Sequence, residues 1–463
     1  MTTAPILHEN LATRRSFFRH FGLGIGSSAF AYLCNQDNLR ASGQLTTHMP
    51  ARAKSVIFFF MCGGVSHMDT FDPKDNRWAG KMVDTTNSNN GRPQSRPVLY
   101  CPRTFTRYGN SGTPVCEWFP HIGSVVDELA VIRSMRTHHI GHFQAAIQMA
   151  TGHKRQVFDY PSLGSWISHS LGSVNENLPT FVNMGRPSSP LQASGGFFGA
   201  KEAATPFQAN GMPLRNLQLP SGVSDLQRRR QMDSLAKLNE QFHQEFAFES
   251  EITARAKSYE LAARLQMSAP EAVNFNDESQ HVLNMYGIDE EVTNPFGRQT
   301  LLARRLVERG VRFIQICHGG RGNGDWDSHD SVADHAPLAL QTDKPIAGLI
   351  KDLKQRGLLD TTLVVWASEF GRTPWSQNTI GRDHNPYGFS VWLAGGGIKG
   401  GIVHGATDDI GHKAIDSPHY VGDLQATILK QMGLDYEQME VEINGAPHQV
   451  IEECDGPIEA ILG

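Results

Sequence analysis

The stretch KSVIFFFMCGG, residues 54–64, decides how the chain is expected to fold. Its apolar residues follow one another without a polar break up to Met61, and the glycine pair Gly63-Gly64 comes soon after. An unbroken apolar run is typical of a strand that is buried on both faces, as in a parallel sheet covered by helices. We therefore expect residues 54–61 to form a central strand that ends at the glycines.

Further apolar segments with the same character lie at residues 129–132, 311–316, 362–366 and 390–393. Helical patterns lie between them, at residues 143–149, 297–309, 345–356 and 423–432. This alternation predicts an α/β fold with a parallel central sheet flanked by helices. Residues from about 224 to 283 are charged and rich in Gln, Glu and Arg, so we expect amphipathic helices inserted between sheet elements.

The composition excludes several classes of protein. With 463 residues, of which 39% are hydrophobic, the chain can bury a sizeable core and is not expected to be disordered. A net charge of −5 argues against a nucleic-acid-binding protein, which normally carries a basic surplus. The six cysteines form no CxxC pair, which disfavours a disulfide scaffold and a thiolate zinc site. Twenty histidines and 45 glycines suit a loop-rich protein that holds metal.

The N-terminus has the pattern of an export signal. Residues 13–19, TRRSFFR, place two arginines before an aromatic pair, and an apolar run follows at residues 21–33. This order is typical of a twin-arginine signal, and the run is shorter than the roughly twenty residues of a membrane-spanning helix. We expect a signal peptide over residues 1–43, the twin-arginine translocase as a partner, a periplasmic mature protein at residues 44–463, and no stable membrane span. An ordinary N-terminal helix is the alternative.

In open α/β sheets, binding groups collect at the carboxyl ends of the strands, so a site is expected at those positions. After the first strand, GGVSHMDTFDPK (residues 63–74) places His67 and Asp69 near one strand end. The alternative is a plain turn, because Gly-Gly and Asp-Pro both break regular structure, and Asp72 is expected to cap it locally.

A histidine-rich segment follows the second expected strand. RSMRTHHIGH (residues 133–142) carries His138, His139 and His142 within five positions, just before a predicted helix. The N-terminus of a helix also favours bound anions. The alternative is a solvated, histidine-rich loop.

Three more polar clusters lie at strand ends. They are CHGGRGNGDWDSHD (residues 317–330, followed by Asp334 and His335), WASEFGRTP (residues 366–374) and GRDHNP (residues 381–386). Carboxylate and imidazole ligands at separate strand ends suit a divalent metal such as zinc or manganese. A mobile acidic loop is the alternative for the first cluster, but Trp326 between two aspartates favours a packed one.

One motif does not predict a dinucleotide site. GGGIKG, residues 395–400, formally fits GxGxxG after a strand. A dinucleotide site needs a helix to follow, whereas residues 402–405 continue as an extended segment. We therefore expect a turn.

Seven segments together resemble the DUF1501 family, a group of mostly exported bacterial proteins. They are GGVSHMDTFDPK, FGRQTLLARRLVERGVRFIQI, WDSH, ASEFGRTP, GRDHNPYGFSVWLAGGGIKGG, ATDDIG and DLQATILKQMGLD. The resemblance runs from about residue 45 to the C-terminus, and the family in turn resembles the alkaline phosphatase and sulfatase superfamily. It implies an alkaline phosphatase-like fold with a mostly parallel sheet and one or two divalent metals at strand ends.

The resemblance also implies roles for individual residues. Asp327 would be the first metal-binding aspartate of the pattern, with His329 or His335 as its companion. Glu369 and Phe370 would stand where the superfamily has an Asp-His pair, and His384 would be the final histidine.

The sequence departs from the superfamily in three places. Phe370 cannot bind a metal, and the first strand ends in Met61-Cys62-Gly63, where an aspartate is usual, so Asp69 would substitute from a different position. Ser134 or Thr137 would be the nearest nucleophile. No cysteine lies in a C-x-P-S-R-like motif, so formylglycine sulfatase chemistry is not expected.

Two functional hypotheses follow. The first is an exported hydrolase of phosphate or sulfate esters, for example on polysaccharide, in which Asp327, His329 and His384 hold a divalent ion such as zinc, manganese or calcium. The second is a relative that has lost catalysis and serves as an exported binding or assembly protein.

The hydrolase hypothesis gives roles to the polar residues around the ion. Arg321 or Arg372 would neutralise an anionic group of the substrate. His138 and His142 would act as acid and base or as further ligands. Glu369 would bind the metal or orient His384.

Overall fold

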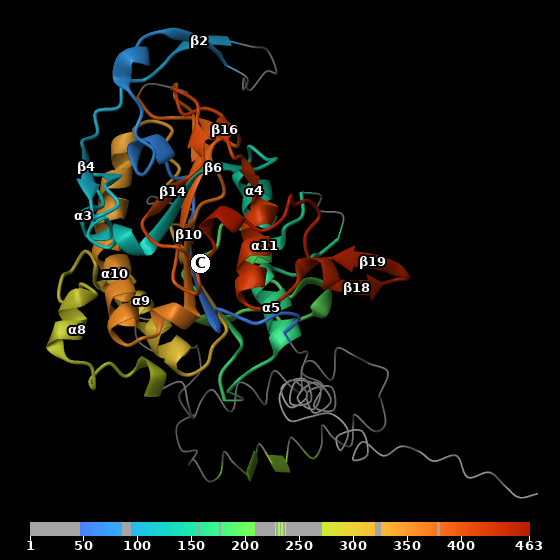
Figure 1. The fold of residues 1–463 in the computed structure, drawn as a ribbon. Coiled ribbons are helices and arrows are strands. Elements are labelled where there is room, and N and C mark those ends of the chain that lie inside the picture. The colour runs from blue at the N-terminus through green and yellow to red at the C-terminus, as the bar shows by residue number, and fades with distance from the viewer. Residues whose placement is uncertain are drawn as a thin grey trace, which may run out of the picture. The chain divides into compact units, whose positions relative to one another are not determined.

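The computed structural model describes residues 47–85, 94–154, 158–175, 177–208, 271–319, 326–376 and 380–463, together with single residues between 227 and 237. The expected signal peptide (residues 1–43), most of the expected insert (residues 224–283) and Arg321 lie outside these residues. Elements keep the labels of Figure 1. None of the helices within the described ranges is long and apolar enough to cross a membrane.

A mixed sheet forms the centre of the described chain (Figure 1). In spatial order its strands are β14 (Ile402–His404), β6 (Leu129–Arg136), β13 (Phe389–Ala394), β10 (Thr362–Ala367), β1 (Ser55–Met61), β9 (Phe313–His318), β7 (Phe181–Met184) and β8 (Thr205–Phe207). The short strand β17 (His419–Tyr420) also pairs with β6. The expected run at residues 54–61 is the strand β1, which pairs in parallel with β9 and β10.

The α/β fold with a mostly parallel sheet is confirmed, with one strand reversed. The segment at residues 390–393 reads like the parallel strands, but β13 pairs antiparallel with both β10 and β6. Burial on both faces gives the same apolar pattern in either direction, so the sequence does not reveal the reversal. Because β13 is reversed, its first residues lie at the sheet edge where the parallel strands end.

Helices cover both faces of the sheet, with α3, α8, α9 and α10 on one side and α4, α5 and α11 on the other (Figure 1). Their bounds are α3 (Pro120–Gly123), α4 (His142–Thr151), α5 (Leu163–Leu171), α8 (Gln280–Met285), α9 (Asn294–Glu308), α10 (His335–Gln355) and α11 (Val421–Gln431). The four helices expected at residues 143–149, 297–309, 345–356 and 423–432 correspond to α4, α9, α10 and α11. The sequence pattern did not predict α5, which follows β6 and α4 in the chain.

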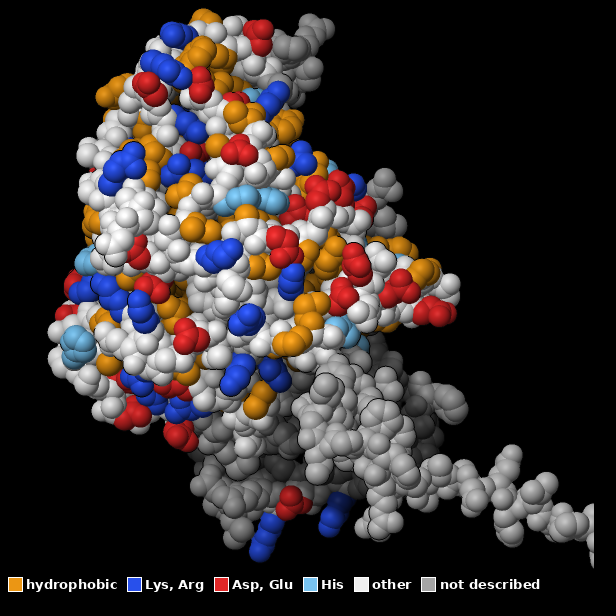
Figure 2. All heavy atoms as spheres, in the orientation of Figure 1, with side chains coloured by type: hydrophobic (Ala, Val, Ile, Leu, Met, Phe, Trp, Pro, Cys, Tyr) orange, Lys and Arg blue, Asp and Glu red, His pale blue; other side chains and the backbone are white. Residues whose placement is uncertain are grey.

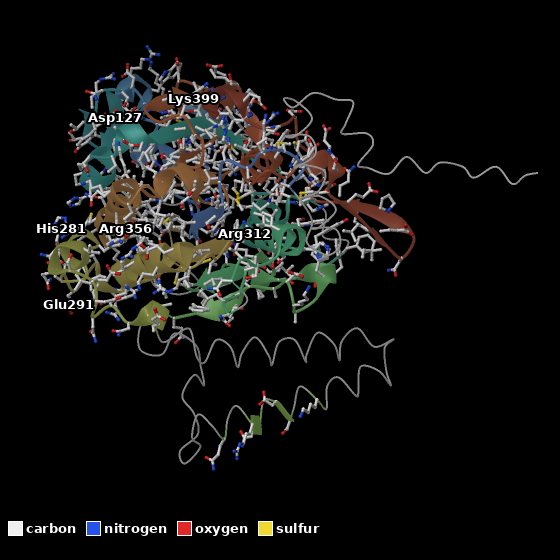
Figure 3. All side chains as sticks on the ribbon, turned by 60° about the horizontal axis from the view of Figure 1, so that its bottom comes forward. Asp127, His281, Glu291, Arg312, Arg356 and Lys399 are labelled. Carbon is white, nitrogen blue, oxygen red and sulfur yellow. The ribbon has the colours of Figure 1, made fainter. Side chains whose placement is uncertain are left out.

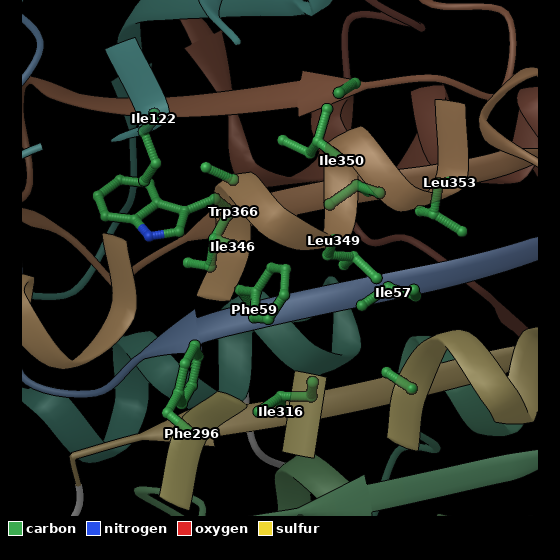
Figure 4. Packing of buried hydrophobic residues seen from close by; sticks show 14 of the residues in the cluster. Ile57, Phe59, Ile122, Phe296, Ile316, Ile346, Leu349, Ile350, Leu353 and Trp366 are labelled. Carbon is green, nitrogen blue, oxygen red and sulfur yellow. The ribbon is translucent and has the colours of Figure 1, made fainter. Parts of the chain in front are cut away.

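Alternation along β1 supplies the core on each face. Ile57 and Phe59 pack with residues of α9 and α10, including Phe296 and Leu349 (Figure 4). Phe58 and Phe60 point the other way, toward the cluster built on α4, α5 and α11. Each such side chain contributes roughly 1.5–3 kcal/mol on burial, so β1 is fixed in place at the end that carries the glycines.

The remaining elements are short and peripheral. The two-stranded sheets are β2 (Met82–Thr85) with β3 (Gln94–Pro97), β4 (Phe105–Tyr108) with β5 (Thr113–Cys116), β11 (Gly371–Arg372) with β12 (His384–Asn385), β15 (Ala406–Thr407) with β16 (Ala414–Asp416), and β18 (Glu440–Ile443) with β19 (Ala446–Gln449). The 3-10 helices are η1 (His67–Asp69), η2 (Asn76–Trp78), η3 (Val126–Glu128), η4 (Pro190–Ala193), η5 (Gly196–Phe198), η6 (Val332–Asp334), η7 (Leu359–Thr361), η8 (Tyr436–Gln438) and η9 (Glu459–Ile461).

Two further features concern the turn after β13 and the surface charge. The glycines at residues 395–397 form a turn between β13 and β14, so the expected turn is confirmed. On the face drawn in Figure 2, basic and acidic side chains are interspersed, in keeping with the small net charge.

Candidate metal centre

Four side chains from distant parts of the chain meet at the edge where the strands end. The ligand atoms of His142, Asp327, His329 and His384 all lie within 4.8 Å of one another. Among the residues that the structure describes, this is the one place where three or more groups of this kind converge so closely. The cluster, which we call the metal centre, is open on one side, because the side chain of Asp327 is 32% exposed.

The fold explains why these four residues meet. His142 is the first residue of α4, shortly after β6 ends at Arg136. Asp327 and His329 follow β9 in the chain. His384 lies in β12, just before β13, and reaches the same edge because β13 runs against its neighbours.

Asp327 accepts contacts from all three imidazoles. Its Oδ1 lies 2.9 Å from Nε2 of His329 and 3.3 Å from Nε2 of His384, and its Oδ2 lies 3.1 Å from Nε2 of His142. Burial alone would raise the pKa of Asp327, but hydrogen bonds from the three histidines and the charge of Arg372 hold that pKa well below its usual range. The carboxylate is therefore ionised at any physiological pH.

Glu369 fixes the orientation of His142. Its Oε1 lies 2.7 Å from Nδ1 of His142 and also accepts a hydrogen bond from the backbone N–H of Gly63 at 2.9 Å. The proton of a neutral His142 therefore sits on Nδ1, and the Nε2 lone pair points at Asp327. Without a cation between them, that lone pair would face a carboxylate.

The pKa of His142 also indicates that a positive charge between His142 and Asp327 is favoured. Burial lowers the pKa of His142, but its hydrogen bonds to Asp327 and Glu369 outweigh this effect and raise the pKa to about 9. Nε2 of His142 lies 3.1 Å from Oδ2 of Asp327. Either a proton or a metal ion must therefore stand between His142 and Asp327.

His384 and His329 face each other across the centre, with their Nε2 atoms 2.9 Å apart. Nδ1 of His384 lies 2.7 Å from the carbonyl oxygen of Ile140 and must donate to it, so Nε2 of a neutral His384 is a bare acceptor. Burial lowers the pKa of His384, which favours that neutral form. The buried Nδ1 of His329 has no hydrogen-bond partner.

The donor set fits a divalent metal ion. Three imidazole nitrogens and one carboxylate oxygen are typical ligands of zinc and of similar transition metals. Hydrogen bonds from the protein orient two of the imidazoles with their lone pairs inward, as is usual for metal-binding histidines. The residues that would hold the ion are therefore His142, Asp327, His329 and His384.

Arg372 lies behind Asp327. It is fully buried, and its Nη2 donates to Oδ1 of Asp327 at 2.6 Å. Its Nε donates to the carbonyl oxygen of Gly64 at 2.7 Å, and Nη2 also donates to the carbonyl oxygen of Gly63. Arg372 therefore holds the carboxylate and the chain end of β1 together, and it does not face the open side.

Gly63 has to be a glycine here. Its φ is +119°, and a Cβ at this position would lie 2.5 Å from the backbone nitrogen of Asp327. The absence of a side chain lets the segment at residues 326–327 approach β1, where the N–H of Trp326 donates to the carbonyl oxygen of Cys62 at 2.9 Å. The glycine after the decisive strand thus sets the position of Asp327.

Phe370 forms an apolar wall of the centre. It is fully buried, and its ring centroid lies 4.8 Å from that of His142 and 4.6 Å from that of His384. In agreement with its chemistry, it supplies no ligand and instead restricts how both imidazoles can rotate.

Several predicted site residues are not brought to the centre. Asp69 is fully buried and bonds to Arg382 at 2.7 Å and to the hydroxyl of Ser66 at 2.5 Å. Burial would raise its pKa, but the charge of Arg382 lowers it, so both groups form a buried ion pair. Asp69 therefore has protein partners away from the four ligands.

The side chains between the end of β6 and the start of α4 point in two directions. Thr137 donates its hydroxyl proton to Oε1 of Gln148 at 2.9 Å. His138 stacks on Tyr420, with ring centroids 4.6 Å apart, and its Nε2 lies 3.4 Å from Glu453. Of the residues predicted here, the structure brings His142 to the centre.

The remaining alternatives concern His335 and Glu369. His335 is fully buried, accepts a hydrogen bond from the backbone N–H of Ser66 at 3.1 Å and lies 2.9 Å from the hydroxyl of Ser328. His329, and not His335, therefore accompanies Asp327. Glu369 was expected to bind the metal or to orient His384, whereas the structure bonds it to His142.

Comparisons with known proteins agree with the family resemblance found in the sequence. A family model described as "Protein of unknown function (DUF1501)" matches residues 53–462. No curated protein matches the chain in sequence.

Three solved structures illustrate the likeness in fold. They are Ps i-CgsB (11% identity, 88% of this chain, 75% of that chain, TM-score 0.38), the lipoteichoic acid synthase LtaP from Listeria monocytogenes (8%, 86%, 78%, 0.36) and the alkaline phosphatase from the Antarctic bacterium TAB5 (12%, 83%, 99%, 0.35). Likenesses this distant assign no reaction to the chain.

Proposed function

The chain belongs to the DUF1501 family, and from the geometry of the metal centre we propose that it is an exported, metal-dependent hydrolase of phosphate or sulfate esters. The observation that carries the proposal is the convergence of His142, Asp327, His329 and His384 on one open edge of the sheet. A divalent ion there would act as a Lewis acid toward an ester oxygen and make water more acidic.

The protein groups around the centre prepare it for a cation. Asp327 is ionised, and Arg372 and three imidazoles fix its two oxygens. Glu369 keeps a proton on Nδ1 of His142 and leaves Nε2 free to bind. Such supporting groups are worth a factor of about 10–100 in metal affinity where they have been removed from other metal sites.

We propose water, and not the hydroxyl of Thr137, as the attacking group. Thr137 donates to Gln148, and His138 is engaged with Tyr420 and Glu453. His142 then serves as a ligand, which leaves Arg321 as the proposed group that neutralises the anionic part of the ester. A sulfated or phosphorylated polysaccharide is the proposed substrate class.

One observation favours the second candidate, an exported binding or assembly protein without catalysis. The buried guanidinium groups of Arg372 and Arg382 point at carbonyl oxygens and at carboxylates of the protein. Neither is therefore presented to an anionic substrate. A centre that binds metal but hydrolyses no ester would support this candidate.

We also propose export by the twin-arginine route, supported by TRRSFFR and the apolar run at residues 21–33. The test is the double variant Arg14→Lys/Arg15→Lys, expressed beside the double variant Arg52→Lys/Arg77→Lys, whose changes lie beyond the signal. We expect the first variant to stay in the cytoplasm as a precursor and the second to reach the periplasm. Export of both would contradict the proposal.

The hydrolase proposal is tested with purified, natively exported protein. Elemental analysis would be run on the wild type, Asp327→Ala and His384→Ala, followed by assays with p-nitrophenyl phosphate, p-nitrophenyl sulfate and sulfated polysaccharides. We expect the ion of the metal centre and the hydrolysis to be lost together, so that both variants hold less metal than the wild type. A well-folded wild type that binds no more zinc or manganese than Asp327→Ala and His384→Ala, when either metal is added, would overturn the proposal.

A further inference from the structure

A second pair of histidines lies at the edge of the sheet formed by β14 and β17. His404 ends β14 and His419 begins β17, and both strands pair in parallel with β6, opposite Ile132 and Met135 respectively. The Nε2 atoms of the two histidines lie 2.9 Å apart, and the ring centroids are separated by 5.1 Å. From this arrangement we propose that His404 and His419 bind a divalent transition-metal ion, such as zinc, nickel or copper, independently of the metal centre.

A buried carboxylate orients one member of the pair. Oδ2 of Asp423 lies 3.3 Å from Nδ1 of His419, and Asp423 is fully buried. The backbone N–H of Tyr420 donates to Oδ2 at 3.0 Å, and that of Asp455 donates to Oδ1 at 2.7 Å, so the carboxylate is fixed. A carboxylate that accepts from Nδ1 leaves Nε2 with a free lone pair, which is the usual arrangement behind metal-binding histidines.

The backbone holds both histidines in place at some cost in strain. Ser417, two residues before His419, has a φ of +45°, which is rare for a residue with a side chain. Its carbonyl oxygen accepts a hydrogen bond of 2.6 Å from the hydroxyl of Ser134 on β6. Strain of this kind persists where the surrounding structure enforces it, and it is concentrated at functional sites.

The same serine also restrains the segment of His404. Gly405 has a φ of +69°, and a Cβ there would lie 1.9 Å from the hydroxyl oxygen of Ser134. Both segments are therefore packed against one residue of β6, which brings two histidines fifteen positions apart into contact.

The geometry places a ring nitrogen of His404 next to that of His419. Their Nε2 atoms face each other at 2.9 Å, so both can reach one ion. Neutral imidazole nitrogens are good ligands for zinc, nickel and copper. Because two protein ligands leave the other coordination positions to solvent, we expect weaker binding here than at the four-ligand centre.

The competing explanation is a plain hydrogen bond, in which Nε2–H of His404 donates to Nε2 of His419. The variant His404→Gln separates the two explanations, because a glutamine amide can still donate to His419 but lacks the imidazole ligand. His281, an exposed histidine of α8, provides the matched control His281→Ala (Figure 3).

The test is equilibrium dialysis of the mature protein against zinc, read by elemental analysis. Each change, His404→Gln, His419→Ala and His281→Ala, would be made in the wild type and in Asp327→Ala/His384→Ala. In the double-variant background we expect about one equivalent of zinc, which is lost with His404→Gln and His419→Ala and kept with His281→Ala. Melting temperatures without metal would confirm that each variant is folded.

The outcome of this test does not depend on whether the metal centre binds an ion. If that centre binds nothing, the wild type would still take up about one equivalent of zinc, and His404→Gln would remove it. Zinc uptake in the double-variant background that is the same for His404→Gln, His419→Ala and His281→Ala would overturn the proposal. As a second readout, Cu²⁺ bound in this background should show nitrogen hyperfine coupling in its electron paramagnetic resonance spectrum, and His404→Gln should abolish it.

Discussion

The two histidine pairs of this protein have the same contact but different surroundings. In both pairs the Nε2 atoms lie 2.9 Å apart, and an acceptor holds Nδ1 of one partner, Ile140 O for His384 and Asp423 for His419. Asp327 and His142 complete the first pair, whereas the described residues bring no third ligand of this kind to the second. Both pairs therefore contain one imidazole that the protein orients, and the pairs differ in the number of ligands that converge on them.

The largest effect should come from removing the group that the second pair lacks. Asp327→Ala takes away the carboxylate that contacts all three imidazoles, so we expect loss of the ion of the metal centre and a fall of about a thousandfold or more in ester hydrolysis. The exposed Asp334 of η6 supplies the matched control, Asp334→Ala, which should keep both properties. Equal behaviour of the two variants in elemental analysis and in the assay would remove Asp327 from the site.

A second difference is that a buried histidine, His335, lies beside the metal centre, where it is bonded to Ser328, the neighbour of Asp327 in the chain. Burial, followed by the charge of Arg372, lowers the pKa of His335 to about 3. Because the unfolded chain takes up this proton near pH 6.5, the native state is stabilised above that pH and loses stability as the pH falls toward the folded pKa. Between pH 7.5 and 4.5 we expect a loss of about 2–3 kcal/mol from this residue.

The measurement is urea unfolding of metal-free wild type and His335→Gln at both pH values. The variant should be less stable at pH 7.5, because it loses the hydrogen bonds to Ser66 and Ser328, but its stability should fall less on acidification. Parallel curves for the two proteins would show that His335 is not held neutral.

The next largest effect concerns Glu369, which accepts a hydrogen bond from His142 at the metal centre. Glu369→Gln replaces the carboxylate that orients His142 by a neutral group of the same shape, so we expect metal affinity to fall by a factor of about 10–100. Competition with a chelator measures this change. The exposed Glu291 offers the control Glu291→Gln, and an affinity equal to that control would mean that Glu369 has no part in metal binding.

The smallest effect should come from the second pair. His404→Gln lies outside the metal centre, so we expect hydrolysis within about twofold of the wild type, while the weaker zinc equivalent is lost. Steady-state assays with a single added equivalent of zinc would check this. A large loss of activity would mean that the two pairs act as one site.

Much of the architecture could be predicted from local patterns. The apolar run at residues 54–61 is the central strand, and the alternation of strands and helices gave the right class of fold. The direction of β13 could not be predicted, because a strand buried on both faces has the same apolar pattern whichever way it runs.

The site was harder to predict, because it depends on contacts between distant residues. Asp69 lies near the end of β1 in the sequence, but Arg382, more than 300 positions away in the chain, pairs with it. His138 and His142 are close in sequence, but they point in different directions at the start of α4. His138 stacks on Tyr420, and His142 contacts Asp327. His404 and His419 carry no spacing signature, so only the pairing of β14 and β17 with β6 reveals them.

The metal centre is expected to bind one metal ion through three imidazoles and one carboxylate. X-ray absorption at the zinc edge, on zinc-loaded His404→Gln, tests it directly because the second pair no longer contributes. We predict the scattering pattern of three imidazole rings with one further oxygen ligand, falling to two rings in His142→Ala/His404→Gln. A spectrum with oxygen ligands alone, or one that His142→Ala leaves unchanged, would contradict the account.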